Sequence, residues 1–288
     1  MTRLPAIAVI GLGPMGRSLA SASLSAGHPT VLWNRSPAKA EALVARGAVL
    51  AATAAEAARS ASVTVLCVLD YAAARAVAAD LADGTLVNLG SGHAAEARDM
   101  AAWAAGRGID YSDGAILTPA PAIGTPAATI LYGGPGELPV LRAFGGTSTY
   151  LGTDPGLPAA YEMALLDLFV MSVGGLAHAF ALAEAEGIAP ATFAPFATGI
   201  GALLPGLADR FAGDLTSGTF TAGISSIASA ASAVAHVRAA ATARGVDTGP
   251  LRAVQAIIDG AVAAGHGGDS YARLARLLTP APSGRQDR

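Results

Sequence analysis

The stretch VIGLGPMG, residues 9–16, decides the fold of this chain of 288 residues. Its glycines Gly11, Gly13 and Gly16 follow a short apolar run with strand character and lead into an apolar helical pattern. In a G-x-G-x-x-G loop the first glycine permits a tight turn, the second lets the backbone approach a pyrophosphate, and the third lets helix and strand pack closely. The helix N-terminus then stabilises the phosphates. Strand, loop and helix in this order predict a dinucleotide-binding site.

Strand-like and helical segments alternate through the first half of the chain. After the glycine loop, HPTVLW, SVTVLCV and GTLVNL have strand character, and a helical pattern follows each of them. This alternation is typical of an α/β Rossmann domain, a mostly parallel sheet with helices on both faces. Beyond residue 155 long helical segments replace it. We predict a Rossmann domain at residues 1–155, an all-α domain at residues 156–278, a long inter-domain helix starting near Leu157, and a disordered tail at residues 279–288.

The end of the second strand, VLWNRS at residues 31–36, indicates which dinucleotide binds. An NAD-binding chain usually has an acidic residue there, which holds the ribose 2′-hydroxyl. Asn34 removes the repulsion of a 2′-phosphate, Arg35 offers a guanidinium, and Ser36 offers a hydroxyl and a backbone N–H. Lys39, one turn further on, can reach the same anion. The pattern predicts NADP(H); a solvated turn that caps a helix is the alternative.

Ser91 follows the strand-like run GTLVNL, at a strand end where Rossmann ligands bind. Its alternatives are to cap the helix AAEARDMAAWAA alone, or to cap it and also contact the nicotinamide end of the cofactor. The complete set of predicted cofactor-binding residues is Gly11, Leu12, Gly13, Pro14, Met15, Gly16, Asn34, Arg35, Ser36, Lys39, Val68, Leu69 and Ser91.

Charge and residue usage exclude several other functions. The chain has 18 Lys and Arg against 21 Asp and Glu, a net charge of −3, and so lacks the basic footprint of nucleic-acid binding. The histidines are isolated, without the spacing that a metal site needs. The single cysteine, Cys67, excludes an internal disulfide and lies in an apolar run typical of a core. We expect no metal, no nucleic-acid partner and, because no signal-peptide pattern is present, a cytoplasmic location.

The stretch MALLDLFVMSVGGLAHAFALA, residues 163–183, is long enough to cross a membrane. Asp167 and His178 interrupt it, and ionisable side chains are costly in lipid. The chain is 52% hydrophobic and 14% charged, with a mean hydropathy of +0.48, so a large interface must absorb the excess apolar surface. We predict no membrane span and instead a central helix packed inside a homodimer.

Five stretches together resemble the imine reductase and reductive aminase family, which is related to the β-hydroxyacid dehydrogenases. They are VIGLGPMG, AGHPTVLWNRSPAKAEALVARGA, LVNLGSG, DGAILTPAPAIGTPAATILYGGP and YLGTDPGLPAAYEMALL. The resemblance runs over residues 5–275 and is stronger in the N-terminal half. It implies an NADPH-dependent reductase with a helical C-terminal domain. It also implies a homodimer with intertwined helical domains, whose active clefts use residues from both subunits.

Two departures from the family pattern concern the active cleft. Gly90 stands before Ser91 where the family usually has threonine, and Glu162 stands where the family usually has Asp or Tyr on the inter-domain helix. The resemblance therefore implies that Glu162 is catalytic, either as a proton donor or as a carboxylate that stabilises an iminium cation. Stabilisation of the helix dipole by an acidic residue in the first turns is the alternative.

The resemblance implies reduction of a C=N bond, in an imine or iminium that we expect to be cyclic, with hydride from NADPH. One alternative is a reductase of a small aldehyde or keto acid, as in the β-hydroxyacid dehydrogenases, but those use a lysine on the inter-domain helix and the only lysine here is Lys39. The other alternative is a catalytically inactive NADPH-binding sensor. Candidate substrate-lining residues, for which core packing is the competing interpretation, are Leu117, Val170 and His236.

Overall fold

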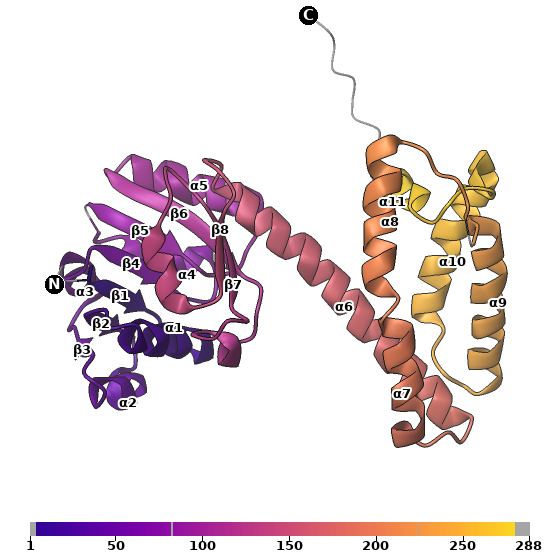
Figure 1. The fold of residues 1–288 in the computed structure, drawn as a ribbon, viewed down its shortest axis with the longest axis horizontal. Helices are drawn as coiled ribbons and strands as arrows, with labels where there is room; N and C mark the ends of the chain where they lie inside the picture. The colour runs from indigo at the N-terminus through magenta and orange to yellow at the C-terminus, as the bar shows by residue number, and fades with distance from the viewer. Residues whose placement is uncertain (1–3, 82, 224, 280–288) are drawn as a thin grey trace, which may run out of the picture. The chain divides into compact units, whose positions relative to one another are not determined.

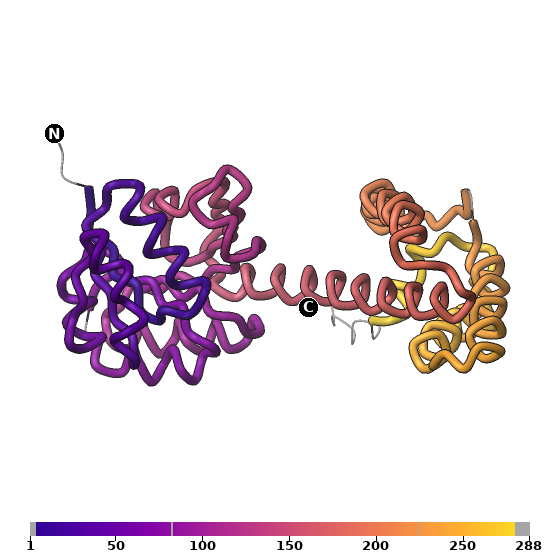
Figure 2. The backbone as a smooth tube through the Cα atoms, turned by 90° about the horizontal axis from the view of Figure 1, so that it is seen from below, coloured from indigo at the N-terminus to yellow at the C-terminus, as the bar shows by residue number. Residues whose placement is uncertain are grey.

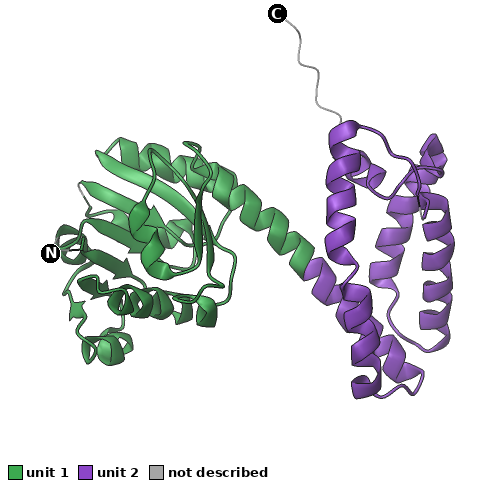
Figure 3. Ribbon diagram, in the orientation of Figure 1, with its two compact units in different colours: residues 1–169 green, residues 170–288 purple. Residues whose placement is uncertain are grey.

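The structure, a computed structural model, describes residues 4–81, 83–223 and 225–279. The chain divides into two compact units, residues 1–169 and residues 170–288 (Figure 3). The division falls inside the long helix α6, Gly156–Ala185, which begins where the predicted Rossmann domain ends. The predicted domain limits stay a prediction, and residues 280–288 of the predicted tail lie outside the described residues.

Unit 1 is built on an eight-stranded sheet in the order β3-β2-β1-β4-β5-β6-β7-β8 (Figure 1). The strands are β1 Ile7–Ile10, β2 Thr30–Trp33, β3 Val49–Leu50, β4 Val63–Leu66, β5 Gly84–Asn88, β6 Ile109–Ile116, β7 Thr129–Gly133 and β8 Thr147–Tyr150. All neighbouring strands are parallel except β6 and β7. The strand order reverses between β1 and β4, which is where Rossmann ligands bind. The predicted mostly parallel Rossmann sheet is confirmed.

Helices cover both faces of this sheet. Besides α6 they are α1 Pro14–Ser25, η1 Pro37–Ala40, α2 Glu41–Val44, α3 Ala54–Arg59, α4 Tyr71–Ala78, α5 Ala94–Ala105, η2 Ala120–Ala122 and η3 Pro139–Phe144. Along β1, Ile7 and Val9 pack into the core that contains α1 and η3, whereas Ala8 and Ile10 pack into cores on the other face. Because successive side chains of a strand point to opposite faces, a sheet covered on both sides needs such uninterrupted apolar strands.

Side-chain caps begin three of these helices. Thr53 caps α3 and Asp70 caps α4 through side-chain oxygens that accept backbone N–H groups. Helix α5 begins with a capping box, in which the side chains of His93 and Glu96 each accept the other residue's N–H. The interpretation of Ser91 as the cap of this helix is therefore wrong, because the cap lies two residues later.

The described part of unit 2 is built from helices, as predicted for the C-terminal domain. Its elements after α6 are α7 Pro190–Gly201, α8 Leu204–Ser217, α9 Ile227–Ala243, α10 Gly249–Ala261, η4 Val262–His266 and α11 Arg273–Leu278. Helices α9 and α10 lie side by side (Figure 2). Between them a small core of buried residues forms from Ile227, Ala230, Ile258 and Ala261.

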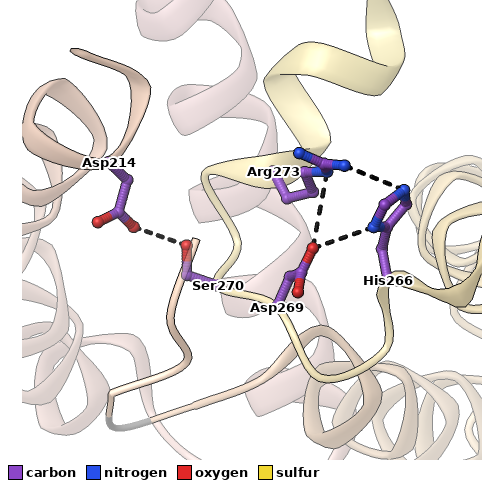
Figure 4. Close-up of polar contacts among 5 residues, drawn as sticks. All are labelled: Asp214, His266, Asp269, Ser270 and Arg273. Atoms are coloured by element: carbon purple, nitrogen blue, oxygen red, sulfur yellow. Dashed lines mark hydrogen bonds and ion pairs between the residues drawn. The ribbon is translucent and has the colours of Figure 1, made fainter. Parts of the chain in front are cut away.

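Polar side chains hold the turn that follows η4 (Figure 4). His266 Nε2 lies 3.3 Å from the Arg273 guanidinium and must accept from it, because a guanidinium can only donate. The other ring nitrogen, Nδ1, then carries the proton and donates to Asp269 at 3.0 Å. In the adjacent contact, Ser270 Oγ donates to Asp214 of α8 at 2.6 Å. These contacts tie α8, η4 and α11 together.

Large apolar side chains along α6 are exposed in the single chain. Phe169 is 64% exposed, Val170 57% and Met171 64%. Two helical stretches, Gly156–Ala185 and Pro190–Ser217, are long and apolar enough to cross a membrane by length and composition alone. The core helix of a soluble protein passes the same test, and the two interrupting residues Asp167 and His178 lie on α6.

Candidate active site

The glycine loop between β1 and α1 has the geometry of a pyrophosphate site. Gly11 has φ +98°, which favours glycine, and its N–H donates to Trp33 O at 3.0 Å. A Cβ on Gly16 would overlap Gly11 O, so this glycine is required for the close contact of helix and strand. A Cβ on Gly13 would meet nothing within 4 Å, so this glycine faces open space. The loop therefore fits a dinucleotide pyrophosphate, with room where the phosphates would lie.

Asn34 has a role that the sequence did not reveal. Its side-chain Oδ1 accepts a hydrogen bond from Leu12 N–H at 2.9 Å, and its Nδ2 donates to Ser36 O at 3.0 Å. The amide thus joins the glycine loop after β1 to the turn after β2. An aspartate could accept the first bond but could not donate the second, and it would repel a 2′-phosphate. Asparagine at this position therefore holds the local structure and is compatible with a 2′-phosphate.

Most of the predicted cofactor residues line one cavity of about 500 Å³. They are Gly11, Leu12, Gly13, Pro14, Met15, Gly16, Asn34, Arg35, Ser36, Lys39, Val68 and Leu69. The lining also includes residues that were not predicted, namely Trp33, Cys67, Ala73 and Val77. Arg35 and Lys39 are exposed at the turn after β2, where their charges can meet a phosphate. Burial raises the pKa of the Cys67 thiol to about 11, so Cys67 is a neutral wall of this cavity.

Ser91 is the one predicted cofactor residue outside that lining. Its hydroxyl donates to Glu162 Oε1 at 2.8 Å, across 71 positions of sequence. Burial raises the pKa of the Glu162 carboxyl, and the hydrogen bond from Ser91 lowers it by less. The loop after β5 and the second turn of α6 are thereby joined through an ionisable group that holds its proton more tightly than usual.

Glu162 lines a second cavity, of about 750 Å³. Its other lining residues are Ile116, Leu117, Thr118, Pro119, Thr129, Leu165, Leu166 and Phe169. Among these lining residues, Glu162 has the single ionisable side chain. Leu117 lies in this cavity as predicted, whereas Val170 and His236 belong to unit 2, are exposed and are not among its lining residues. A substrate role for these two residues stays a prediction.

An ion pair sets the start of α6 and hence the place of Glu162. Asp154 accepts from the Arg98 guanidinium at 2.7 and 3.0 Å, and its Oδ1 also accepts from Gly156 N–H at 2.9 Å. The Arg98 hydrogen bonds hold the pKa of the Asp154 carboxyl below its usual range. Because Arg98 lies on α5, this contact fixes the first turn of α6 against the helix that follows the Ser91 loop.

Sequence reasoning missed a buried carboxyl group behind the Ser91 loop. Asp113 on β6 is 1% exposed and accepts hydrogen bonds from Tyr71, Tyr111 and Asn88. A signal was present in the segment IDYSDGAI, where an acidic residue interrupts a strand that must be buried on both faces. Buried carboxyl groups near a cleft are candidates for function.

Comparison with known protein families identifies relatives of both parts of the chain. The family described as "NADPH-dependent reductive aminase-like, C-terminal domain" matches residues 154–280. The family described as "NAD binding domain of 6-phosphogluconate dehydrogenase" matches residues 6–152. Among curated proteins, the NADPH-dependent reductive aminase of Aspergillus oryzae is 30% identical over 281 residues, which span 93% of this chain and 95% of that protein.

Solved structures give the same result. The reductive aminase from Aspergillus terreus in complex with NADPH and ethyl levulinate is 31% identical, with a TM-score of 0.90 over 96% of this chain and 100% of that chain. The imine reductase from Myxococcus stipitatus in complex with NADP+ is 33% identical, with a TM-score of 0.90 and the same coverage. Similarity therefore extends over both the Rossmann and the helical parts.

Replacing Arg35 by alanine should weaken NADPH binding about 10- to 100-fold and leave NADH binding almost unchanged, because a hydrogen bond to a charged group contributes about 1.5–3 kcal/mol. Fluorescence titration of both cofactors measures this. Arg59→Ala, at the end of α3 and outside the cavity lining, is the matched control. Equal loss of affinity for NADPH and NADH would contradict the assignment of Arg35 to the 2′-phosphate.

Replacing Gly90 by alanine should lower the free energy of unfolding by about 1–3 kcal/mol, as overpacking does in close-packed sites. A Cβ there would lie 2.8 Å from Val68 O and 3.2 Å from Asn88 Oδ1. Chemical denaturation measures the change. Gly136→Ala, where an added Cβ meets nothing within 4 Å, is the control and should behave like wild type. An unchanged stability in Gly90→Ala would show that the loop adapts to the larger residue.

Proposed function

This chain belongs to the reductive aminase and imine reductase family, and on that premise we propose that it reduces a C=N bond to an amine with NADPH. The observation that carries the proposal is the apolar cavity with Glu162 as its one ionisable lining group, in the same unit as the glycine loop. The loop that carries Ser91 connects the glycine-loop cavity to the Glu162 cavity. It approaches Val68 of the cofactor cavity, as the position of Gly90 shows, and it holds Glu162.

NADPH, when bound, supplies the hydride that reduces the carbon of the C=N bond. The chain holds this cofactor at the glycine loop and selects its 2′-phosphate with Arg35, Ser36 and Lys39. In the Glu162 cavity, the apolar walls around Leu117, Leu165 and Phe169 bind the substrate and exclude water. These walls suit an uncharged, largely hydrocarbon imine, or the ketone and amine from which an imine forms.

Glu162 protonates the imine nitrogen in this proposal. Its buried carboxyl keeps a proton to higher pH than an exposed glutamate does, and so can transfer it near neutral pH. After transfer the Glu162 carboxylate remains beside the iminium cation and stabilises it. Glu162 then first donates the proton and afterwards stabilises the iminium cation within the same reaction step. The nitrogen gains the proton, the carbon gains the hydride, and the carboxylate recovers a proton from solvent.

A keto acid is a poor match for the same cavity. A carboxylate substrate needs a cationic partner, and none of the lining residues of the Glu162 cavity is cationic. The one lysine of the chain, Lys39, lines the cofactor cavity. A sensor without activity would have no need for a carboxyl with a raised pKa at the apolar cavity. Imine reduction therefore accounts for more of the site than either alternative.

We further propose that the chain forms a homodimer with intertwined helical domains, in the cytoplasm. The exposed apolar side chains of α6 support the dimer, because a monomer that exposed them to water would lose the stabilisation of burial. Asp167 and His178 on the same helix argue against lipid. The free thiol of Cys67 fits a reducing compartment.

The proposed activity is tested by following NADPH absorbance with a panel of cyclic imines, a panel of small keto acids, and no substrate. Oxidation of NADPH that depends on the imine, with formation of the amine, supports the proposal. Turnover with keto acids alone would establish the hydroxyacid dehydrogenase alternative. Binding of NADPH without turnover on any substrate would establish the sensor.

Replacing Glu162 by glutamine should lower kcat for imine reduction about 10²–10⁴-fold, because general acid catalysis typically contributes that much. Wild-type kcat should fall as the pH rises through the raised pKa of Glu162, since the protonated form is the donor, and this fall should be absent in the variant. Glu184→Gln, in the last turn of the same helix, is the control. A wild-type kcat and pH profile in Glu162→Gln would remove Glu162 from the chemistry.

The dimer should persist at sub-micromolar concentration in analytical ultracentrifugation, because an obligate interface buries more than about 2,000 Å². Val173→Asp, at an exposed apolar position of α6, should shift the protein toward monomer or aggregate. Val49→Asp, at an exposed position of the edge strand β3, should not. A stable, folded wild-type monomer would contradict the proposal.

A further inference from the structure

Both backbone polar groups of Leu12, in the glycine loop, are bound by side chains. Its N–H donates to Asn34 Oδ1 at 2.9 Å, and its carbonyl oxygen accepts from the Arg17 guanidinium at 3.0 Å. Asn34 follows β2 and Arg17 lies on α1, so the two side chains reach Leu12 from different elements. The Leu12 side chain is fully buried in the core that contains α1. Leu12 is thus anchored at three points between the glycines Gly11 and Gly13.

The bond from Arg17 fixes the direction of the neighbouring N–H group. A carbonyl and the N–H that follows it belong to one planar peptide, and in the trans form they point in opposite directions. The Leu12 carbonyl points to Arg17, so the N–H of Gly13 points away from Arg17. Gly13 lines the cofactor cavity of about 500 Å³, and Arg17 is not among its lining residues. Arg17 therefore holds the peptide from outside the cavity and leaves the Gly13 N–H available to it.

The glycine loop offers few N–H donors to a pyrophosphate. The Leu12 N–H is used by Asn34, and Pro14, the first residue of α1, has no N–H. The Gly13 N–H has no acceptor among the described residues, and a Cβ on this glycine would meet nothing within 4 Å. An anion can therefore approach this N–H without displacing a protein group. The alignment of the Gly13 N–H matters more here than in a loop where every residue has a free N–H.

Arg17 holds the backbone on both sides of this N–H. Besides the bond from its guanidinium to Leu12 O, its backbone N–H donates to Gly13 O at 3.0 Å. Within residues 4–81, 83–223 and 225–279, Arg17 is the one donor to the Leu12 carbonyl, and no carboxylate forms an ion pair with it. No acidic side chain therefore competes with the Leu12 carbonyl for the guanidinium.

We propose that Arg17 is a positioning residue for the pyrophosphate of the cofactor, which acts by holding the Leu12–Gly13 peptide with its N–H toward the cavity. The inference deepens the proposed function and rests on it for the cofactor, NADPH. The role differs from that of Arg35, because Arg35 is assigned to the 2′-phosphate that NADH lacks, whereas both cofactors carry the pyrophosphate. A role in folding alone would join the loop to α1 and leave cofactor affinity unaffected.

Cofactor titrations test the inference without turnover. Arg17→Met keeps most of the apolar part of the side chain and removes the donor, so the Kd for NADPH and the Kd for NADH should rise by the same factor, about 3- to 10-fold. Adenosine 2′-phosphate, which has the 2′-phosphate and no pyrophosphate, should bind with wild-type affinity in an NMR titration. Arg35→Ala should show the opposite pattern, with weaker binding of NADPH and adenosine 2′-phosphate and an unchanged Kd for NADH.

Arg46→Met is the matched control. The Arg46 guanidinium also binds α1, where it donates to Ser21 Oγ at 2.6 Å and to Ser25 Oγ at 3.1 Å. These contacts lie in the later turns of the helix, and Arg46 is not among the lining residues of the cofactor cavity. Its replacement should therefore leave all three affinities at their wild-type values. Equal weakening in Arg46→Met and Arg17→Met would assign the effect to the anchoring of α1 and overturn the inference.

Ionic strength separates positioning from a direct attraction between charges. A hydrogen bond within the protein depends little on salt, so the ratio of the Arg17→Met Kd to the wild-type Kd should be the same at low and at high ionic strength. An attraction between the exposed Arg17 charge and the pyrophosphate would be screened. A ratio that falls toward one at high salt would therefore overturn the positioning role.

Arg17→Gln, which removes the charge and shortens the side chain, replaces Arg17→Met if that variant does not fold, and the same results are expected. Unchanged Kd values in a folded Arg17 variant, or a loss confined to NADPH, overturn the inference. Because these titrations need no turnover, absence of imine reduction in wild type would refute the proposed function and leave the role of Arg17 to be judged on the affinities alone.

Discussion

The close approach of α1 to β1 is the constraint on which the rest of the structure depends. Gly16 allows it because any side chain there would overlap Gly11 O, and Gly11 adopts a φ that favours glycine. With the helix this close, its N-terminus meets the carboxyl edge of the sheet at the point where strand order reverses. Asn34 then joins this loop to the next strand end. The loops that line the cofactor cavity follow the carboxyl ends of the parallel strands β1, β2 and β4.

A second constraint is the shortage of cations around the carboxyl groups of the site. Asp113 is stabilised by neutral donors, and Glu162 has a single hydroxyl donor. A lysine beside Glu162 would lower the pKa of its carboxyl and so oppose the proposed role of Glu162 as a proton donor to the imine. The absence of lysine from α6 is therefore compatible with reduction of C=N bonds, even though it removes the usual acid of the β-hydroxyacid dehydrogenases. The absence of this lysine distinguishes reduction of C=N bonds from the hydroxyacid dehydrogenase reaction on the same fold.

The sequence predicted those features that follow from local patterns. The spacing of Gly11 and Gly16 and the order of apolar runs were sufficient for the Rossmann sheet, and Arg35 and Lys39 lie at the predicted cavity. The role of Ser91 could not be predicted, because its hydrogen-bond partner Glu162 lies 71 positions away in the sequence. The residue that caps α5 is His93 and not Ser91. Long-range contacts of this kind leave no periodic signal in a single sequence. Asp113 was missed for the same reason, although its charge within a buried strand was visible.

Helix α6 combines two requirements that belong to different parts of the enzyme. Its first turns hold Glu162 in place through Asp154, Arg98 and Ser91, so that part must be rigid relative to the sheet. Its later turns are apolar on most faces and exposed in the single chain, which supports the proposed homodimer. In the proposed homodimer, one continuous helix would connect the interface to the position of Glu162. A weakened interface would then disturb Glu162 without any change near it, and activity would be lost on dilution.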